Sequence, residues 1–248
     1  MAGVKPPSGG EAALRKRPRG QPRAQPIIAL DVPTLAAARE LIARLGPDAD
    51  YVKVGLELFT AEGPTVVEWL LGDGRRVFLD LKLHDIPNTV RAAARSAAAM
   101  GVSLLTVHGY GGAPMVDAAV EGAGSATGVM VVTVLTSFDA AALGVALGRD
   151  APELGSEVLR LAGVARAAGA HGIVCSGQEV RVVRTTHPTL APLVPGIRLA
   201  GGAAHDQARV TTPERAAEDG AAYLVIGRAV TAAADPAAEL ARVIAALR

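Results

Sequence analysis

The sequence predicts an α/β protein with the (β/α)8 or TIM-barrel fold, a single domain behind a basic N-terminal extension. Short apolar runs alternate with stretches of helical period, a pattern typical of parallel strands joined by helical crossovers. Eight such runs recur at a spacing of roughly 25 residues, and the 248-residue chain matches the usual barrel length of about 250 residues. An open doubly wound sheet is the alternative, but no glycine fingerprint follows the first run, where the chain continues ALDVPT.

Each expected element rests on its own local pattern. The strands are short apolar runs. In chain order they are PIIALD (26–31), YVKVG (51–55), RVFLDL (76–81), SLLTVHG (103–109), VMVVTVLT (129–136), HGIVCS (171–176), LVPGI (193–197) and YLVIG (223–227). The helices are Ala-, Leu- and Arg-rich stretches of helical period, clearest in TLAAARELIARL (34–45), NTVRAAARSAAAM (88–100) and PAAELARVIAAL (236–247).

Residues 1–25 differ in composition from the barrel, which is expected over residues 26–248. This segment carries six Lys or Arg residues against one Glu, a charge of +5, while the whole chain carries +1. Its polarity, prolines and glycines leave it unable to fold alone. Nucleic-acid binding and targeting are alternative roles, although the prolines argue against an amphipathic transit helix. We expect a solvated, flexible extension.

The composition argues against several classes of protein. No apolar stretch approaches the roughly 18 residues of a membrane helix, and the chain does not open on an apolar run of signal-peptide type. Three Phe, three Tyr and one Trp give little aromatic surface for stacking bases. The single cysteine, Cys175, has no disulfide partner within the chain and is expected in the core. We therefore expect a cytoplasmic protein without a membrane or nucleic-acid partner.

The segment FLDLKLHDIPNTV, residues 78–90, places charged residues where a buried strand is expected. Side chains alternate across a strand, so Asp80 and Lys82 share the inner face while the intervening leucines face the helices. The same alternation in YVKVG points Lys53 into the barrel, and in PIIALD it does the same for Asp31. Four ionised side chains should therefore converge at the C-terminal ends of strands, where barrels carry their active sites.

Burying this much charge is costly unless the groups alternate in sign and hydrogen-bond to one another. Lys53, Asp80 and Lys82 can do so. A purely structural ion-pair network is the alternative, but such networks stabilise weakly, and perturbed charges concentrate at active sites. Asp85 has the wrong strand parity and precedes Pro87. It is expected at the turn, either as a helix-start cap or as a ligand brought to a site by other means.

Glycine and arginine follow the last two expected strands. Arg198 comes after LVPGI, and Gly227 with Arg228 comes at the end of YLVIG. Barrels commonly bind phosphate there, since an arginine supplies a planar fork that matches phosphate oxygens and a glycine lets the backbone approach closely. Surface salt bridges are the alternative role for both arginines. The five histidines lie on different expected elements without metal-ligand spacing, so no metal is expected.

The charged segment and several later turns together resemble one enzyme family. Residues 80–89 match throughout the motif Asp-x-Lys-x-x-Asp-Ile-Pro-x-Thr of the orotidine 5′-phosphate decarboxylases. The shorter motifs ALD, YVKVG, TVLTS, PGIR and VIGR occur in the family's order between about Pro26 and the C-terminus. The resemblance implies a barrel that decarboxylates orotidine 5′-phosphate to UMP, the last step of de novo UMP biosynthesis. It also implies a homodimer and no cofactor.

The resemblance implies a role for each matching residue. Lys82 is similar to the group that stabilises and protonates a carbanion at C6, Asp80 to the carboxylate facing the substrate carboxylate, and Lys53 to the cation linking Asp80 to the ribose. Asp85 and Thr89 resemble residues supplied across a dimer interface to the other subunit's site. The further substrate-binding residues implied are Asp31 at the ribose, Thr136 and Ser137 at the pyrimidine edge, and Arg198, Gln207, Gly227 and Arg228 at the phosphate.

Two other functions compete with this interpretation. A magnesium-dependent sugar-phosphate decarboxylase or aldolase uses a similar Asp-x-Lys-x-x-Asp segment, but needs metal-binding carboxylates and lacks the Ile-Pro-x-Thr continuation. An inactive barrel that only binds nucleotide is disfavoured because the complete set of catalytic residues is retained. Residues 138–155 form an insertion to which the sequence assigns no chemistry.

Overall fold

The computed structural model describes residues 23–199 and 211–248, which form a closed barrel of parallel strands. The strands pair in chain order, and the last pairs with the first. They are β1 (Gln25–Ala29), β2 (Tyr51–Gly55), β3 (Arg76–Leu83), β4 (Leu104–His108), β5 (Gly128–Val132), β6 (Gly172–Val174), β7 (Ala191–Val194) and β8 (Tyr223–Ile226). The predicted (β/α)8 fold is therefore confirmed.

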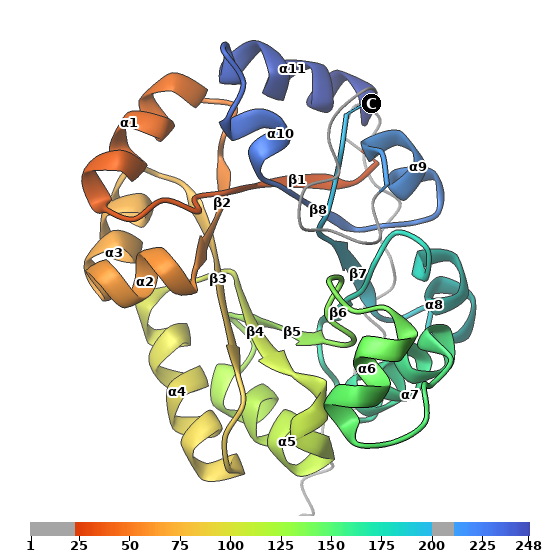
Figure 1. The fold of residues 1–248 in the computed structure, drawn as a ribbon. Coiled ribbons are helices and arrows are strands. Elements are labelled where there is room, and N and C mark those ends of the chain that lie inside the picture. Colours follow the sequence, from red (N-terminus) through yellow and green to blue (C-terminus); the bar gives the residue numbers. More distant parts are fainter. Residues whose placement is uncertain (1–22, 200–210) are drawn as a thin grey trace, which may run out of the picture.

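Helices surround the barrel (Figure 1). They are α1 (Leu35–Leu45), α2 (Leu56–Glu62), α3 (Pro64–Gly72), α4 (Pro87–Met100), α5 (Gly112–Ala123), α6 (Ala140–Leu147), α7 (Leu154–Ala167), α8 (Val180–Thr186), α9 (Pro213–Glu218), α10 (Arg228–Thr231) and α11 (Pro236–Ala246), with the 3-10 helix η1 (Gly109–Gly111). Thr34 and Asp235 cap α1 and α11 through their side-chain oxygens. No helix in the described part of the chain is long and apolar enough to cross a membrane.

The strands coincide with the expected runs, and their ends are shifted. β3 continues to Leu83, β6 is limited to Gly172–Val174, and β7 lies at Ala191–Val194 instead of 193–197. β5 stops at Val132 instead of Thr136, because the chain leaves the sheet after Thr133, whose hydroxyl donates to the Val174 carbonyl at 2.7 Å. β1 begins at Gln25, and Ala24 before it is fully buried. The barrel thus begins slightly before the expected boundary at residue 26, and residues 1–22 of the expected extension lie outside the described residues.

Strand alternation produces two separate cores. The inner core fills the barrel and contains Ile27, Ala29, Tyr51, Phe78, Leu104, Met130, Leu193 and Val225. The outer core packs the opposite faces of the strands, including Val52, Val54 and Leu79, against the helices. Cys175 is buried in this outer core, as expected. Because the inner core closes the barrel below its mouth, polar side chains beyond it on each strand face an open end.

Candidate active site

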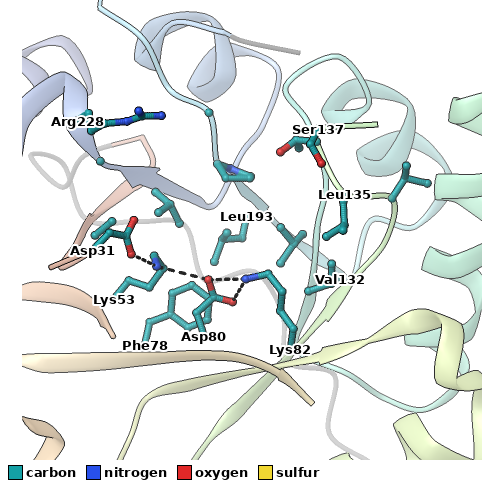
Figure 2. A pocket seen from close by; sticks show the side chains of 18 of the residues that line it. Asp31, Lys53, Phe78, Asp80, Lys82, Val132, Leu135, Ser137, Leu193 and Arg228 are labelled. Carbon is teal, nitrogen blue, oxygen red and sulfur yellow. Dashed lines mark hydrogen bonds and ion pairs between the residues drawn. The ribbon is translucent and has the colours of Figure 1, made fainter. Parts of the chain in front are cut away.

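A single cavity of about 540 Å³ lies at the C-terminal mouth of the barrel. The predicted residues that line it are Asp31, Lys53, Asp80, Lys82, Thr136, Ser137, Arg198, Gly227 and Arg228. Phe78, Leu193 and Val225 of the inner core also border the cavity. Arg228 and Ser137 lie across it from the charged groups on β2 and β3 (Figure 2). Side chains separated by up to 197 positions in the sequence are thus brought to one mouth.

Four ionised side chains in this cavity form a chain of alternating sign (Figure 2). Lys53 Nζ lies 2.8 Å from Asp31 Oδ1 and 3.6 Å from Asp80 Oδ2. Lys82 Nζ lies 2.9 Å from both carboxylate oxygens of Asp80. The side chains of Lys53 and Asp80 are 9% and 12% exposed, while that of Asp31 is 60% exposed. The side chain of Lys82 is 34% exposed, so the chain of charges is buried at its middle and reaches solvent at both ends.

Asp80 is held as a carboxylate despite its burial. Burial on its own raises the pKa of Asp80, but Lys53, Lys82 and the hydrogen bonds from Lys82 and Thr106 outweigh it and hold that pKa below its usual range. The site therefore presents a fixed negative charge next to the Lys82 ammonium. An ammonium fixed in this way can stabilise negative charge that develops beside it and can then donate a proton.

β3 is irregular around Lys82. Its pairing with β4 places Leu79 opposite Leu105 and then Leu83 opposite Val107, so β3 carries extra residues between the two matched positions. Lys82 has a φ of 49°, the only positive φ at a non-glycine residue in the described ranges. Bulges of this kind re-aim side chains beside active sites. Here Lys82 lies within the irregular stretch, and its side chain is the one that contacts Asp80.

Two residues that the sequence analysis did not single out contact the charged groups. Thr106 on β4 is fully buried, and its hydroxyl donates to Asp80 Oδ1 at 2.9 Å. Gly55 ends β2, and a β-carbon at this position would lie 2.8 Å from Lys53 Nζ and 3.2 Å from Asp31 Oδ1. The available sequence signals were a hydroxyl on the inner face of an apolar strand and a glycine two positions after the inward lysine.

The opposite side of the cavity carries the glycine and arginines expected at a phosphate. Gly227 immediately precedes α10, and a β-carbon there would meet only Ala29 Cβ, at 3.9 Å, so the space beside it is open. The Arg198 backbone N–H donates to the Thr211 carbonyl at 2.9 Å, which ties this part of the mouth to the start of α9. Gln207 lies outside the described residues.

Asp85 and Thr89 do not line the cavity of their own chain. Asp85 is exposed at the turn between β3 and α4, and its Oδ1 accepts a hydrogen bond from the backbone N–H of Ile86 at 2.6 Å. Ile86 is 67% exposed, and Thr89 is exposed in the first turn of α4. Strand parity therefore placed Asp85 correctly at the turn, and the segment projects from the barrel with an apolar side chain in solvent.

The histidines near the mouth form a ring stack beside the cavity. His84 and His108 stack with their centroids 5.6 Å apart, and His108 stacks on Tyr110 at 5.4 Å. Burial, with His84 and Lys82 nearby, lowers the pKa of His108 to about 4, so this ring is neutral at pH 7. His84 is exposed and is not part of the cavity lining. Within residues 23–199 and 211–248, no three His, Cys, Asp or Glu side chains are grouped to hold a metal ion.

Fold and site together define a (β/α)8 barrel with a cavity lined by charges of alternating sign at its C-terminal mouth, where enzymes of this fold carry their active sites. The comparison with protein families gives the particular group. The chain belongs to the orotidine 5′-phosphate decarboxylase / HUMPS family, whose model matches residues 24–243.

Individual relatives agree with this assignment. The chain is 56% identical over 219 residues to the orotidine 5′-phosphate decarboxylase of Anaeromyxobacter sp. (strain K), covering 88% of this chain and 95% of the relative. It is 48% identical over 229 residues to the protein of the same name from Moorella thermoacetica, covering 89% and 90%. The crystal structure of orotidine 5′-phosphate decarboxylase from Lactobacillus acidophilus superimposes with a TM-score of 0.80 at 33% identity, covering 91% of this chain and 99% of the other.

Proposed function

We propose that this chain decarboxylates orotidine 5′-phosphate to UMP, the last step of de novo UMP biosynthesis, in the cavity at the C-terminal mouth. The observation that carries the proposal is the charged chain Asp31–Lys53–Asp80–Lys82, whose middle pair is buried and whose two outer links are hydrogen bonds of 2.8–2.9 Å. Membership of the orotidine 5′-phosphate decarboxylase / HUMPS family supports it. The reaction as proposed uses neither metal nor organic cofactor.

Lys82 carries the chemical step. When the bond between C6 and the carboxylate breaks, CO2 leaves and the electron pair stays at C6, where no adjacent carbonyl can delocalise it as an enolate. A fixed cation beside C6 stabilises this carbanion, and the Lys82 ammonium then donates its proton to give UMP. Asp80, kept ionised by Lys53 and Lys82, faces the departing carboxylate and holds Lys82 in place.

The remaining cavity residues hold the nucleotide. Lys53 and Asp31, 2.8 Å apart, bind the ribose hydroxyls, and the loop with Thr136 and Ser137 contacts the pyrimidine edge. Arg228, on the other side of the cavity, binds the phosphate. Arg198, Gly227 and Gln207, which lies outside the described residues, bind the same phosphate. Since the phosphate is remote from C6, its binding energy can be used to orient the ring in the transition state.

The proposal includes a homodimer in which Asp85 and Thr89 complete the site of the neighbouring subunit. Their exposure at the start of α4, outside the cavity of their own chain, and the exposed Ile86 between them support it. The cytoplasmic location, without membrane or nucleic-acid partners, belongs to the same proposal.

Subunit mixing tests the shared site. Lys82→Ala and Asp85→Asn homodimers should both be inactive, but a mixed dimer has one site with both side chains intact. After verified exchange of equal amounts, activity should return to about a quarter of the wild-type value, because half of randomly formed dimers are mixed. No recovery would mean that Asp85 acts within its own chain.

The reaction itself is tested by following the absorbance of orotidine 5′-phosphate with the purified protein in excess EDTA. We expect full activity and stoichiometric UMP. Activity that disappears with EDTA and returns with Mg²⁺ would favour the metal-dependent sugar-phosphate decarboxylase or aldolase. UMP binding without loss of the substrate absorbance would mean an inactive nucleotide-binding barrel.

A further inference from the structure

Thr106 is a buried residue that contacts both Lys82 and Asp80. It lies on β4, two residues after Leu104 of the inner core, and its side chain is fully buried. Its hydroxyl makes two hydrogen bonds: it accepts from the Lys82 backbone N–H at 2.8 Å and donates to Asp80 Oδ1 at 2.9 Å. The one hydroxyl therefore joins the backbone of the proposed proton donor to the carboxylate that orients its ammonium.

The irregularity in β3 explains why Lys82 needs such a partner. The β3–β4 pairing skips from Leu79 to Leu83, so the ordinary strand ladder is interrupted at Lys82. A buried backbone N–H without an acceptor is costly, and the Thr106 hydroxyl serves as the acceptor instead. Lys82 also holds a φ of 49°, a conformation that non-glycine residues keep only where the surroundings fix it.

The second hydrogen bond fixes the carboxylate. Asp80 Oδ1 receives both Lys82 Nζ and the Thr106 hydroxyl at 2.9 Å, while Oδ2 faces Lys82 at 2.9 Å and Lys53 at 3.6 Å. Rotation of the carboxylate would break the bond to Thr106 and change both lysine contacts. Because the ionised Asp80 carboxylate can only accept, the single hydroxyl proton is donated to Asp80, while a lone pair of the same oxygen accepts from the Lys82 backbone N–H.

We propose that Thr106 is a positioning residue for decarboxylation, which sets the Lys82 ammonium and the Asp80 carboxylate relative to the reacting carbon without touching substrate. The proposal rests on the proposed function, since it concerns the geometry of the groups assigned to that reaction. Losing the hydroxyl should affect the chemical step far more than substrate binding, because Thr106 is fully buried and does not line the cavity.

Three substitutions isolate the hydroxyl. Thr106→Val keeps the shape and removes the hydroxyl, while Thr106→Ser and Thr106→Ala differ from one another only by the hydroxyl. We expect kcat to fall roughly 10- to 100-fold in the Val and Ala variants, the effect of losing a hydrogen bond to a charged group. KM should change by less than about threefold, and Ser should retain activity within about threefold of the wild type. The Ala and Ser pair keeps the comparison usable if Val does not fold.

A matched control comes from the other end of the barrel. Thr127 is also buried, and its hydroxyl donates to the Val102 carbonyl at 2.7 Å. Thr127→Val should leave kcat and KM unchanged. Wild-type kcat in Thr106→Val and Thr106→Ala, or equal losses in Ser and Ala, would overturn the positioning role. An inactive wild-type protein would instead contradict the proposed function.

Discussion

Both ends of the barrel have a polar cavity, but the ion pair at the N-terminal end is exposed, whereas the central pair at the C-terminal end, Lys53 and Asp80, is buried. At the N-terminal end, a cavity of about 440 Å³ is bordered by Tyr51, Arg76, Ser103, Thr127, His171 and Tyr223 among others. Its ion pair, Arg76 with Asp50 at 2.8 Å, has side chains 46% and 57% exposed. At the C-terminal mouth, Lys53 and Asp80 are almost completely buried.

The groups at the N-terminal end mainly satisfy one another. The Arg76 guanidinium lies 4.4 Å from the centroid of the Tyr51 ring, and His171 Nε2 lies 2.9 Å from the Tyr223 hydroxyl. An exposed pair of this kind contributes little free energy and has little electrostatic effect on a ligand. A polar hollow is therefore a weak indication of an active site, whereas buried charges of alternating sign, held by several hydrogen bonds, are a strong one.

The largest expected effect comes from removing the central cation. Lys82→Ala should lower kcat by roughly 10⁴-fold or more, because both carbanion stabilisation and proton donation are lost. Arg76→Ala at the other end should leave kcat within about twofold of the wild type. Steady-state assays with circular dichroism as a check of folding would decide between these outcomes. Comparable losses in both variants would remove the distinction between the two ends.

Replacing one glycine with alanine at each end of the barrel compares how the two ends tolerate an added methyl group. In Gly55→Ala the new methyl group must displace the Lys53 ammonium, which would lie 2.8 Å away, and kcat/KM should fall roughly 10- to 100-fold. In Gly128→Ala the methyl group meets Leu104 Cδ2 at 2.8 Å and His171 Cγ at 2.9 Å. This second variant should lose about 1–3 kcal/mol of stability while kcat/KM stays within about twofold. Activity loss confined to Gly128→Ala would contradict the account.

Asp80 at the C-terminal end and Asp50 at the N-terminal end should contribute differently to the free energy of unfolding. Asp80→Asn leaves two lysines without their shared carboxylate and should lower the free energy of unfolding by about 3 kcal/mol at neutral pH. Asp50→Asn should cost less than about 1 kcal/mol. Urea denaturation at pH 7 measures both, and equal costs would show that burial does not separate the two pairs.

The stability difference between the wild type and Asp80→Asn should depend on pH, because folding shifts the pKa of Asp80. The pKa of Asp80 is lowered in the folded state, so the stabilisation is present above the unfolded pKa of about 3.9 and is lost as the pH falls through the folded pKa. The stability advantage of the wild type over Asp80→Asn should therefore shrink below about pH 4. An advantage that grows in acid would contradict the assigned shift.

The sequence predicted the barrel and much of the site because strand alternation is a local property. Parity alone placed Lys53 and Asp80 inside and Leu81 among the outer-core contacts. It could not predict how Lys82 reaches Asp80, since the β3 irregularity and the φ of 49° arise from pairing with β4. Thr106 and Gly55 escaped notice for the same reason: each matters through a neighbour on another strand. Asp85 lies outside the cavity of its own chain. Strand parity indicated this position but could not predict which site Asp85 serves.

A crystal structure of the protein with bound UMP would show directly where the nucleotide lies. We expect nucleotide density in the C-terminal cavity, with C6 next to Lys82 Nζ, the ribose at Lys53 and Asp31, and the phosphate beside Gly227 and Arg228. Nucleotide bound instead among Tyr51, Arg76 and Tyr223, or a C6 atom remote from Lys82 in the C-terminal cavity, would contradict it.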